Sequence, residues 1–98
     1  MTDARIMTAE QARGIFGGTA GDSLRTEAGL WYDFLQSRFE EAERAPKHHR
    51  LLGEAYGRLT ASLVHNDIEA SLESLNWMRG EAQFFANHPD FPANLMGV

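Results

Sequence analysis

The sequence contains no cysteine, and this absence removes several kinds of chemistry together. Without a thiol the chain can form no disulfide framework, no thiolate metal site and no cysteine nucleophile. Long apolar runs are also missing, since no stretch approaches the roughly 18 residues that a membrane span needs. The opening residues, MTDARIM, lack the basic and then apolar layout of a secretory signal. We therefore expect a cytoplasmic protein with no membrane partner.

Positive charge is scarce as well. Nine Lys and Arg residues stand against 14 Asp and Glu residues, which gives a net charge of -5. Binding to a phosphate backbone depends on clustered cations, so the composition argues against nucleic acid as a partner. A nucleic-acid-binding alternative would depend on the segment RAPKHHR at 44–50, together with Arg38 and Arg58.

Strand signals are absent too, because no segment bounded by turn residues alternates in period two with β-branched enrichment. Apolar residues instead recur at helical spacing in three segments of about 20 residues, joined by very short turns. Helices joined in this way must run antiparallel. The sequence thus predicts an all-α fold: an antiparallel bundle of three long helices preceded by a short N-terminal helix and completed by dimerisation.

The 98 residues are expected to form one domain, 1–98, with three parts. Residues 1–22 should hold a short helix, with Thr8 and Gln11 as its capping box, followed by a glycine hinge. Residues 23–87 should form the bundle, with Asp22 or Ser23 capping its first helix. Residues 88–98 should form an extended C-terminal tail.

Two turns should divide the bundle. Pro46 ends the first long helix near residue 44 and suits the first turn of the second, which runs to about residue 65. Asn66 is then expected to cap the last helix, with Glu69 reaching back to the cap.

Two glycines lie inside the expected second helix, where each costs roughly 0.5 to 1 kcal/mol relative to alanine. Either good packing elsewhere in the helix outweighs this cost, or the small residues allow a second backbone to approach closely. We favour close approach, either by the N-terminal helix or by a second copy of the chain. The predicted self-interface consists of Gly53, Gly57, Ala61 and Val64.

Aromatic residues indicate a second surface. Trp77 and Phe84 lie together on the last helix, opposite its main apolar stripe, so they need cover from a partner or from the tail through Phe91. Leu30 and Phe34 widen the apolar face of the first long helix in the same way. The predicted partner-binding residues are Trp77, Phe84, Phe91, Leu30 and Phe34.

The basic cluster at the start of the second long helix is a third candidate. Lys47, His49 and Arg50 could dock a carboxylate or phosphate at exposed helix N–H groups. The alternative, which we prefer, is that the acids at 40, 41 and 43 neutralise the cluster.

Catalysis finds no support in the motifs. No Glu has a His three residues later, so a carboxylate di-iron site has no support, and no nucleophile elbow is present. We predict no catalytic residue, no metal ligand and no cofactor. The pairs His48–His49 and His65–Glu69 leave a metal-binding helical protein as an alternative.

These features predict a small non-enzymatic, protein-binding regulator, adaptor or chaperone-like factor that acts through helical apolar surfaces, with a protein partner and a homodimer. The alternative is a structural or accessory subunit of a larger assembly, such as an enzyme complex or a virion.

Overall fold

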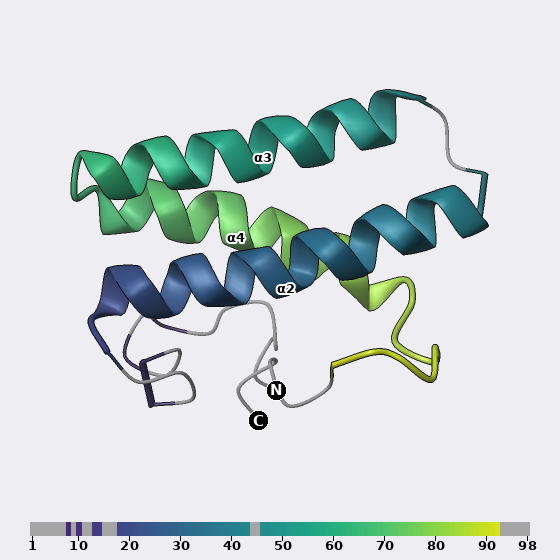
Figure 1. The fold of residues 1–98 in the computed structure, drawn as a ribbon, viewed down its shortest axis with the longest axis horizontal. Coiled ribbons are helices and arrows are strands. Elements are labelled where there is room, and N and C mark those ends of the chain that lie inside the picture. Colours follow the sequence, from purple (N-terminus) through teal and green to yellow (C-terminus); the bar gives the residue numbers. More distant parts are fainter. Residues whose placement is uncertain (1–7, 9, 11–12, 15–17, 44–45, 93–98) are drawn as a thin grey trace.

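Three helices account for most of the chain that can be described. The computed structural model describes residues 8, 10, 13–14, 18–43 and 46–92. Within them α2 spans Ala20–Glu41, α3 spans Pro46–Val64 and α4 spans Ile68–Gln83. The short links make consecutive helices antiparallel, and each helix contacts the other two (Figure 1). The predicted all-α three-helix bundle is confirmed, whereas most of the helix expected over 8–16 lies outside the described residues.

The start of α2 differs from the prediction. Thr19 is the N-cap, and its hydroxyl accepts a hydrogen bond from the backbone N–H of Asp22 at 3.1 Å. Ser23, which we expected as a cap, lies inside the helix and donates to the Thr19 carbonyl at 2.9 Å. The helix therefore begins three residues earlier than predicted and includes Gly21, because the Thr19 side chain satisfies one of the free N–H groups of the first turn.

The cap of α4 is also displaced from the prediction. Asp67, and not Asn66, is the N-cap, and its carboxylate accepts from the backbone N–H of Ala70 at 3.1 Å. Asn66 adopts a positive φ of 58°, and its N–H closes α3 on the Leu63 carbonyl at 3.0 Å. Asparagine tolerates this left-handed conformation better than most residues do, so Asn66 makes the turn and leaves the cap to Asp67.

The core lies between the three helices, and each helix buries one face in it. Trp31 and Phe39 are its largest fully buried apolar side chains, and both come from α2. Tyr32 of α2 and Tyr56 of α3 pack beside the core with ring centroids 4.9 Å apart. The buried apolar residues are Leu24, Ala28, Trp31, Phe34, Leu35, Phe39, Leu52, Ala55, Leu59, Leu75, Met78 and Ala82.

An ion pair lies fully inside this core. Glu27 of α2 and Arg79 of α4 are both 0% exposed, and the guanidinium binds the carboxylate through two bonds: Nε to Oε2 at 2.6 Å and Nη2 to Oε1 at 2.7 Å. Trp31 Nε1 donates to Glu27 Oε2 at 2.8 Å, and Arg79 Nη1 donates to Asn76 Oδ1 at 2.9 Å. Two-bond geometry and further hydrogen bonds are what a buried pair needs to offset its desolvation.

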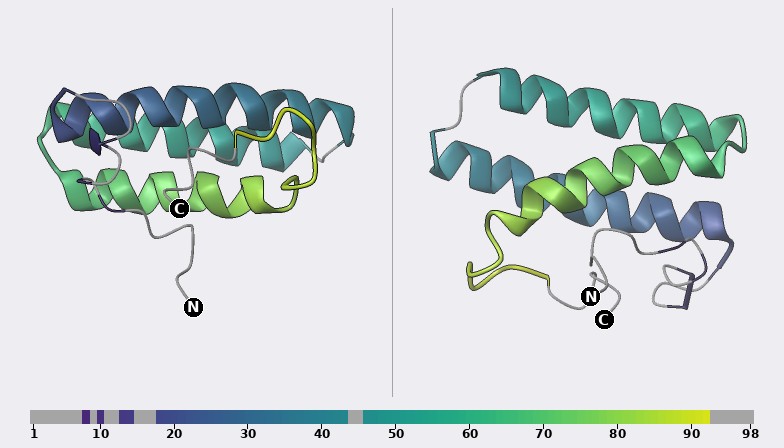
Figure 2. Two further views of the ribbon diagram at one scale, coloured as in Figure 1. Left: turned by 90° about the horizontal axis from the view of Figure 1, so that it is seen from below. Right: turned by 180° about the vertical axis from the view of Figure 1, so that it is seen from behind.

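After α4 the chain turns back onto α2 (Figure 2). The Phe91 ring lies 5.7 Å from Trp31 and 5.7 Å from Phe34, measured between centroids. His88 Nδ1 accepts from the backbone N–H of Asp90 and lies 3.0 Å from Arg38 Nη1, so this nitrogen is an acceptor for both. The described part of the predicted tail is thus held against α2.

No helix within residues 18–43 and 46–92 has both the length and the hydrophobicity that a membrane span needs.

The ion pair can be tested by removing its partners in turn. Arg79→Met should lower the free energy of unfolding by about 3–5 kcal/mol, because it leaves the Glu27 carboxylate buried and unpaired. Adding Glu27→Gln should restore at least about 1 kcal/mol while keeping an acceptor for Trp31. Urea denaturation followed by circular dichroism measures both. Arg25→Met, at a half-exposed site 3.9 Å from Asp22, is the matched control and should change stability by under about 0.5 kcal/mol. A double variant no more stable than Arg79→Met would refute this account.

Candidate functional site

A groove of about 410 Å³ runs between α3 and α4. Trp77 forms part of its apolar lining, together with Leu51 and Ala55 from α3. Its rims carry charge, because Glu54, Arg58 and Glu73 line it and are exposed. The complete lining is Leu51, Glu54, Ala55, Arg58, Glu73, Ser74 and Trp77.

The α4 rim is one helical ridge. Glu69, Glu73, Trp77 and Glu81 follow one another at intervals of four residues, and side chains at this interval are neighbours on a helix surface. Glu69 and Glu73 are exposed, while Trp77 is half-buried and packs against the core. Phe84 lies just beyond the end of α4 and is 76% exposed. An indole and a phenyl ring therefore lie on an acidic surface.

Ser74 contributes an unusual polar group to the groove. Its side chain is 4% exposed, and its hydroxyl has no hydrogen-bond partner among the described residues. Four other helical hydroxyls donate to the carbonyl of the preceding turn, so that their bonding is satisfied within the helix. These are Ser23, Thr26, Thr60 and Ser71. The Ser74 hydroxyl is therefore a buried polar group without a partner, on a residue that lines the groove.

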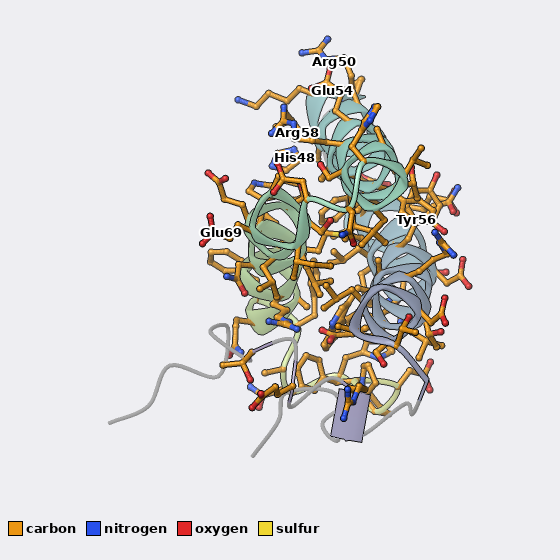
Figure 3. All side chains as sticks on the ribbon, turned by 90° about the vertical axis from the view of Figure 1, so that its left-hand side faces the viewer. His48, Arg50, Glu54, Tyr56, Arg58 and Glu69 are labelled. Carbon is orange, nitrogen blue, oxygen red and sulfur yellow. The ribbon has the colours of Figure 1, made fainter. Side chains whose placement is uncertain are left out.

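The α3 rim is of mixed charge. Arg50, Glu54 and Arg58 project outward from α3, whereas Tyr56 points toward α2 (Figure 3). Arg50 Nε lies 4.0 Å from Glu54 Oε1, at the limit of an ion pair between two exposed side chains. Such a pair contributes little to stability.

Burial of Arg79 determines the charge of α4. The helix contains three acids and one base, and that base is the fully buried Arg79, bonded to Glu27. All the ionised side chains that α4 presents on its surface are consequently carboxylates: Glu69, Glu73 and Glu81.

The structure separates the five predicted partner-binding residues into two groups. Trp77 lines the α3–α4 groove, and Phe84 is the exposed C-cap of α4, seven residues further along. Phe34 is buried and packs edge-on against Phe85 and Phe91, while Leu30 remains 45% exposed. The chain itself covers the second group, apart from a shallower hollow of about 320 Å³ near Leu30. The sequence allowed the tail to cover Trp77 and Phe84. The described part of the tail packs on α2 instead.

The four predicted self-interface residues all lie on the exposed side of α3. Gly53, Gly57 and Ala61 are exposed, and Val64 is 77% exposed. A Cβ atom added at either glycine would meet nothing within 4 Å. Described residues therefore do not cover this face, and the cost of the glycines is not explained by packing within the described part of the chain.

The predicted anion-docking residues differ in their surroundings. Lys47 and Arg50 are exposed, whereas the His49 ring packs against Phe39 with centroids 5.9 Å apart. Glu41, one of the acids that could neutralise the cluster, pairs instead with Arg38 at 2.7 Å.

Metal ligands do not gather either. No group of three or more His, Asp or Glu side chains that could hold a metal ion occurs among the described residues, which include His48, His49, His65 and Glu69.

Comparisons with protein-family models, curated proteins and solved structures find no match, so function must be inferred from this chain alone.

Sequence reasoning found Trp77 and Phe84, with Glu73 and Glu81 beside them, but missed Ser74. The four-residue interval of Glu69, Glu73, Trp77 and Glu81 is visible in the sequence and could have revealed the ridge. The free hydroxyl of Ser74 could not be found in this way, because its bonding depends on the packed structure.

The absence of a partner for the Ser74 hydroxyl can be tested by its effect on stability. Ser74→Ala should leave the free energy of unfolding unchanged or raise it by up to about 1 kcal/mol, since it removes a buried polar group without a partner. Ser71→Ala, one turn earlier and equally buried, should lower it by about 0.5–1 kcal/mol because Ser71 Oγ donates to the Asp67 carbonyl at 2.9 Å. Thermal unfolding of the two variants measures the difference. Equal losses would mean that the Ser74 hydroxyl has a partner within the chain.

Proposed function

We propose that this protein is a non-enzymatic binding module, a regulator, adaptor or chaperone-like factor, which docks a protein partner on the α3–α4 side of the bundle. The observation that carries the proposal is the pair formed by Phe84, 76% exposed, and Trp77, which lines the open groove. Large aromatic side chains at the surface are enriched among the residues that dominate binding energy.

The distribution of the chain's own cover supports this surface over the others. The apolar patch of α2 receives Phe91 and Phe85, so it is already used within the molecule. The groove receives no comparable cover from the described residues, and its buried Ser74 hydroxyl is left without a partner. A docking partner would supply the apolar contact that the groove lacks.

Self-association through α3 is the second part of the proposal. None of the four residues Gly53, Gly57, Ala61 and Val64 has a side chain larger than valine, so a second helix could approach the backbone of α3 closely at these positions. Closing that face would offset the helix-propensity cost of two exposed glycines.

A structural or accessory subunit of a larger assembly is the second candidate. It is favoured by the presence of two open surfaces on different sides of α3, the groove and the glycine face. Such a subunit would bury both permanently, whereas an adaptor would exchange its partner.

Photo-crosslinking tests the docking surface. A benzophenone amino acid at position 84 should form specific adducts in an extract of the native host, because this side chain is 76% exposed and lies seven residues along the chain from Trp77 of the groove. The same amino acid at Gln36, exposed on α2, is the matched control and should not form those adducts. Adding Trp77→Ala should reduce the yield at position 84 at least about tenfold, as expected for an anchor residue.

Two results would reject the docking surface: no adduct at position 84, or the same adducts from positions 84 and 36. Circular dichroism of each variant must show helical content near that of the wild type, so that loss of binding is not loss of fold.

Light scattering over a range of concentrations tests self-association. The wild type should approach twice the monomer mass as concentration rises, and Gly57→Leu should remain monomeric because its side chain would occupy the open face. Gln36→Leu, on the exposed side of α2, is the control and should dimerise like the wild type. In the monomer, Gly57→Ala should add about 0.5–1 kcal/mol of stability. A wild type that stays monomeric throughout would rule out this interface.

A further inference from the structure

We propose that the α3–α4 groove binds a partner helix that is amphipathic and basic, with an apolar stripe on Trp77 and Leu51 and with Lys or Arg side chains against the carboxylates of α4. This inference rests on the proposed function and specifies the chemistry of its partner. It is argued from charge, from the ridge geometry and from the shape of the groove.

Charge is the first argument. The ionised side chains that α4 presents on its surface are all acidic, because its base, Arg79, is 0% exposed and bonded to Glu27. Glu69 and Glu73 are four residues apart on this surface, and like charges at that interval destabilise a helix. Among the described residues, no ion pair neutralises Glu69 or Glu73. Cations from a partner would relieve the repulsion between them.

The position of Trp77 is the second argument. On the ridge it has Glu73 four residues before it and Glu81 four residues after it. A Lys or Arg side chain placed here can lie over the indole face while its charged end pairs with a carboxylate. An indole between two acids is therefore suited to a cation carried on an aliphatic stem.

The shape of the groove is the third argument. It lies between two antiparallel helices, a geometry that receives the side-chain ridge of another helix. Leu51 is 39% exposed at this site and Ala55 leaves room beside it, so an apolar side chain of the partner can contact both.

Arg58 defines the orientation of the charges. It is the base that lines the groove, and it comes from α3, so the basic side of the partner must face α4. A partner with uniformly spread positive charge would meet Arg58 unfavourably, and removing that repulsion should strengthen its binding.

Two synthetic peptides of about 18 residues provide the test, both long enough to form a helix and both with leucine at the same helical positions. One carries lysine and the other glutamate at the remaining positions. Fluorescence anisotropy of each labelled peptide is measured against the full-length protein. The lysine peptide should bind at least about tenfold more tightly than the glutamate peptide, and its affinity should fall as salt is added.

Three charge variants locate the binding. Glu73→Lys should weaken the lysine peptide at least about tenfold, whereas Arg58→Glu should leave it unchanged or strengthen it. Glu40→Lys makes the same charge change on the exposed side of α2 and should alter affinity by less than about twofold. Trp77→Ala should weaken binding, and Phe84→Ala provides a second aromatic variant at a site that contributes nothing to the core.

Several results would overturn the inference. These are no binding of the lysine peptide, equal binding of the two peptides, or equal effects of Glu73→Lys and Glu40→Lys, which would indicate net charge alone. If Glu73→Lys changes the solution mass without peptide, a second copy of the chain occupies the groove and the inference is wrong. Adducts at position 84 with an acidic or neutral partner segment would reject the basic helix while leaving the proposed function intact, and absence of adducts would reject the proposed function itself.

Discussion

The rest of the structure depends on the buried pair formed by Glu27 and Arg79. Two unpaired charges inside a core would be prohibitively costly, so α2 and α4 must meet at a register that brings the carboxylate and the guanidinium together. Their two bonds, at 2.6 and 2.7 Å, fix that register, and the hydrogen bond from Trp31 fixes the largest side chain of the core on the same carboxylate. The pair also acts at the surface. By withdrawing Arg79 from solvent it leaves α4 with carboxylates alone, so one interaction orders the interior and sets the charge of the candidate site.

The second determinant is which aromatic surface the chain covers for itself. After α4 the described C-terminal segment returns to α2, where Phe91 packs on Trp31 and Phe34 and where Arg38 holds the His88 ring. The segment cannot cover the other side of α4 at the same time. The two apolar patches, equivalent in the sequence, thus become unequal in the fold: one is part of the core and the other, with Trp77 and Phe84, remains open.

The glycines of α3 say less about a binding partner than the groove does. A Cβ atom would meet nothing at Gly53 or Gly57, so neither glycine is required by a contact among the described residues. Close approach of a second backbone would give them a purpose, yet a small-residue face on its own does not identify what approaches. The groove carries more information, because charge, an indole ridge and a buried hydroxyl without a partner occur together there and each restricts the chemistry of what can bind.

The sequence by itself determined the class and order of the fold. Helical periodicity, Pro46 and the Asn-Asp turn depend on residues that are close in the sequence, so they can be recognised without the structure. The predicted helix caps were wrong because Thr19 and Asp67 are as suitable for capping as Ser23 and Asn66. Trp77 and Phe84 could be found for the same reason, as a seven-residue interval on one helix. The tertiary structure alone decided that Arg79 is buried, that Phe34 and Phe91 cover each other, and that the Ser74 hydroxyl is left over. Each of these depends on contacts between distant positions, 52 residues apart for Glu27 and Arg79, and no local pattern records which distant groups desolvate one another.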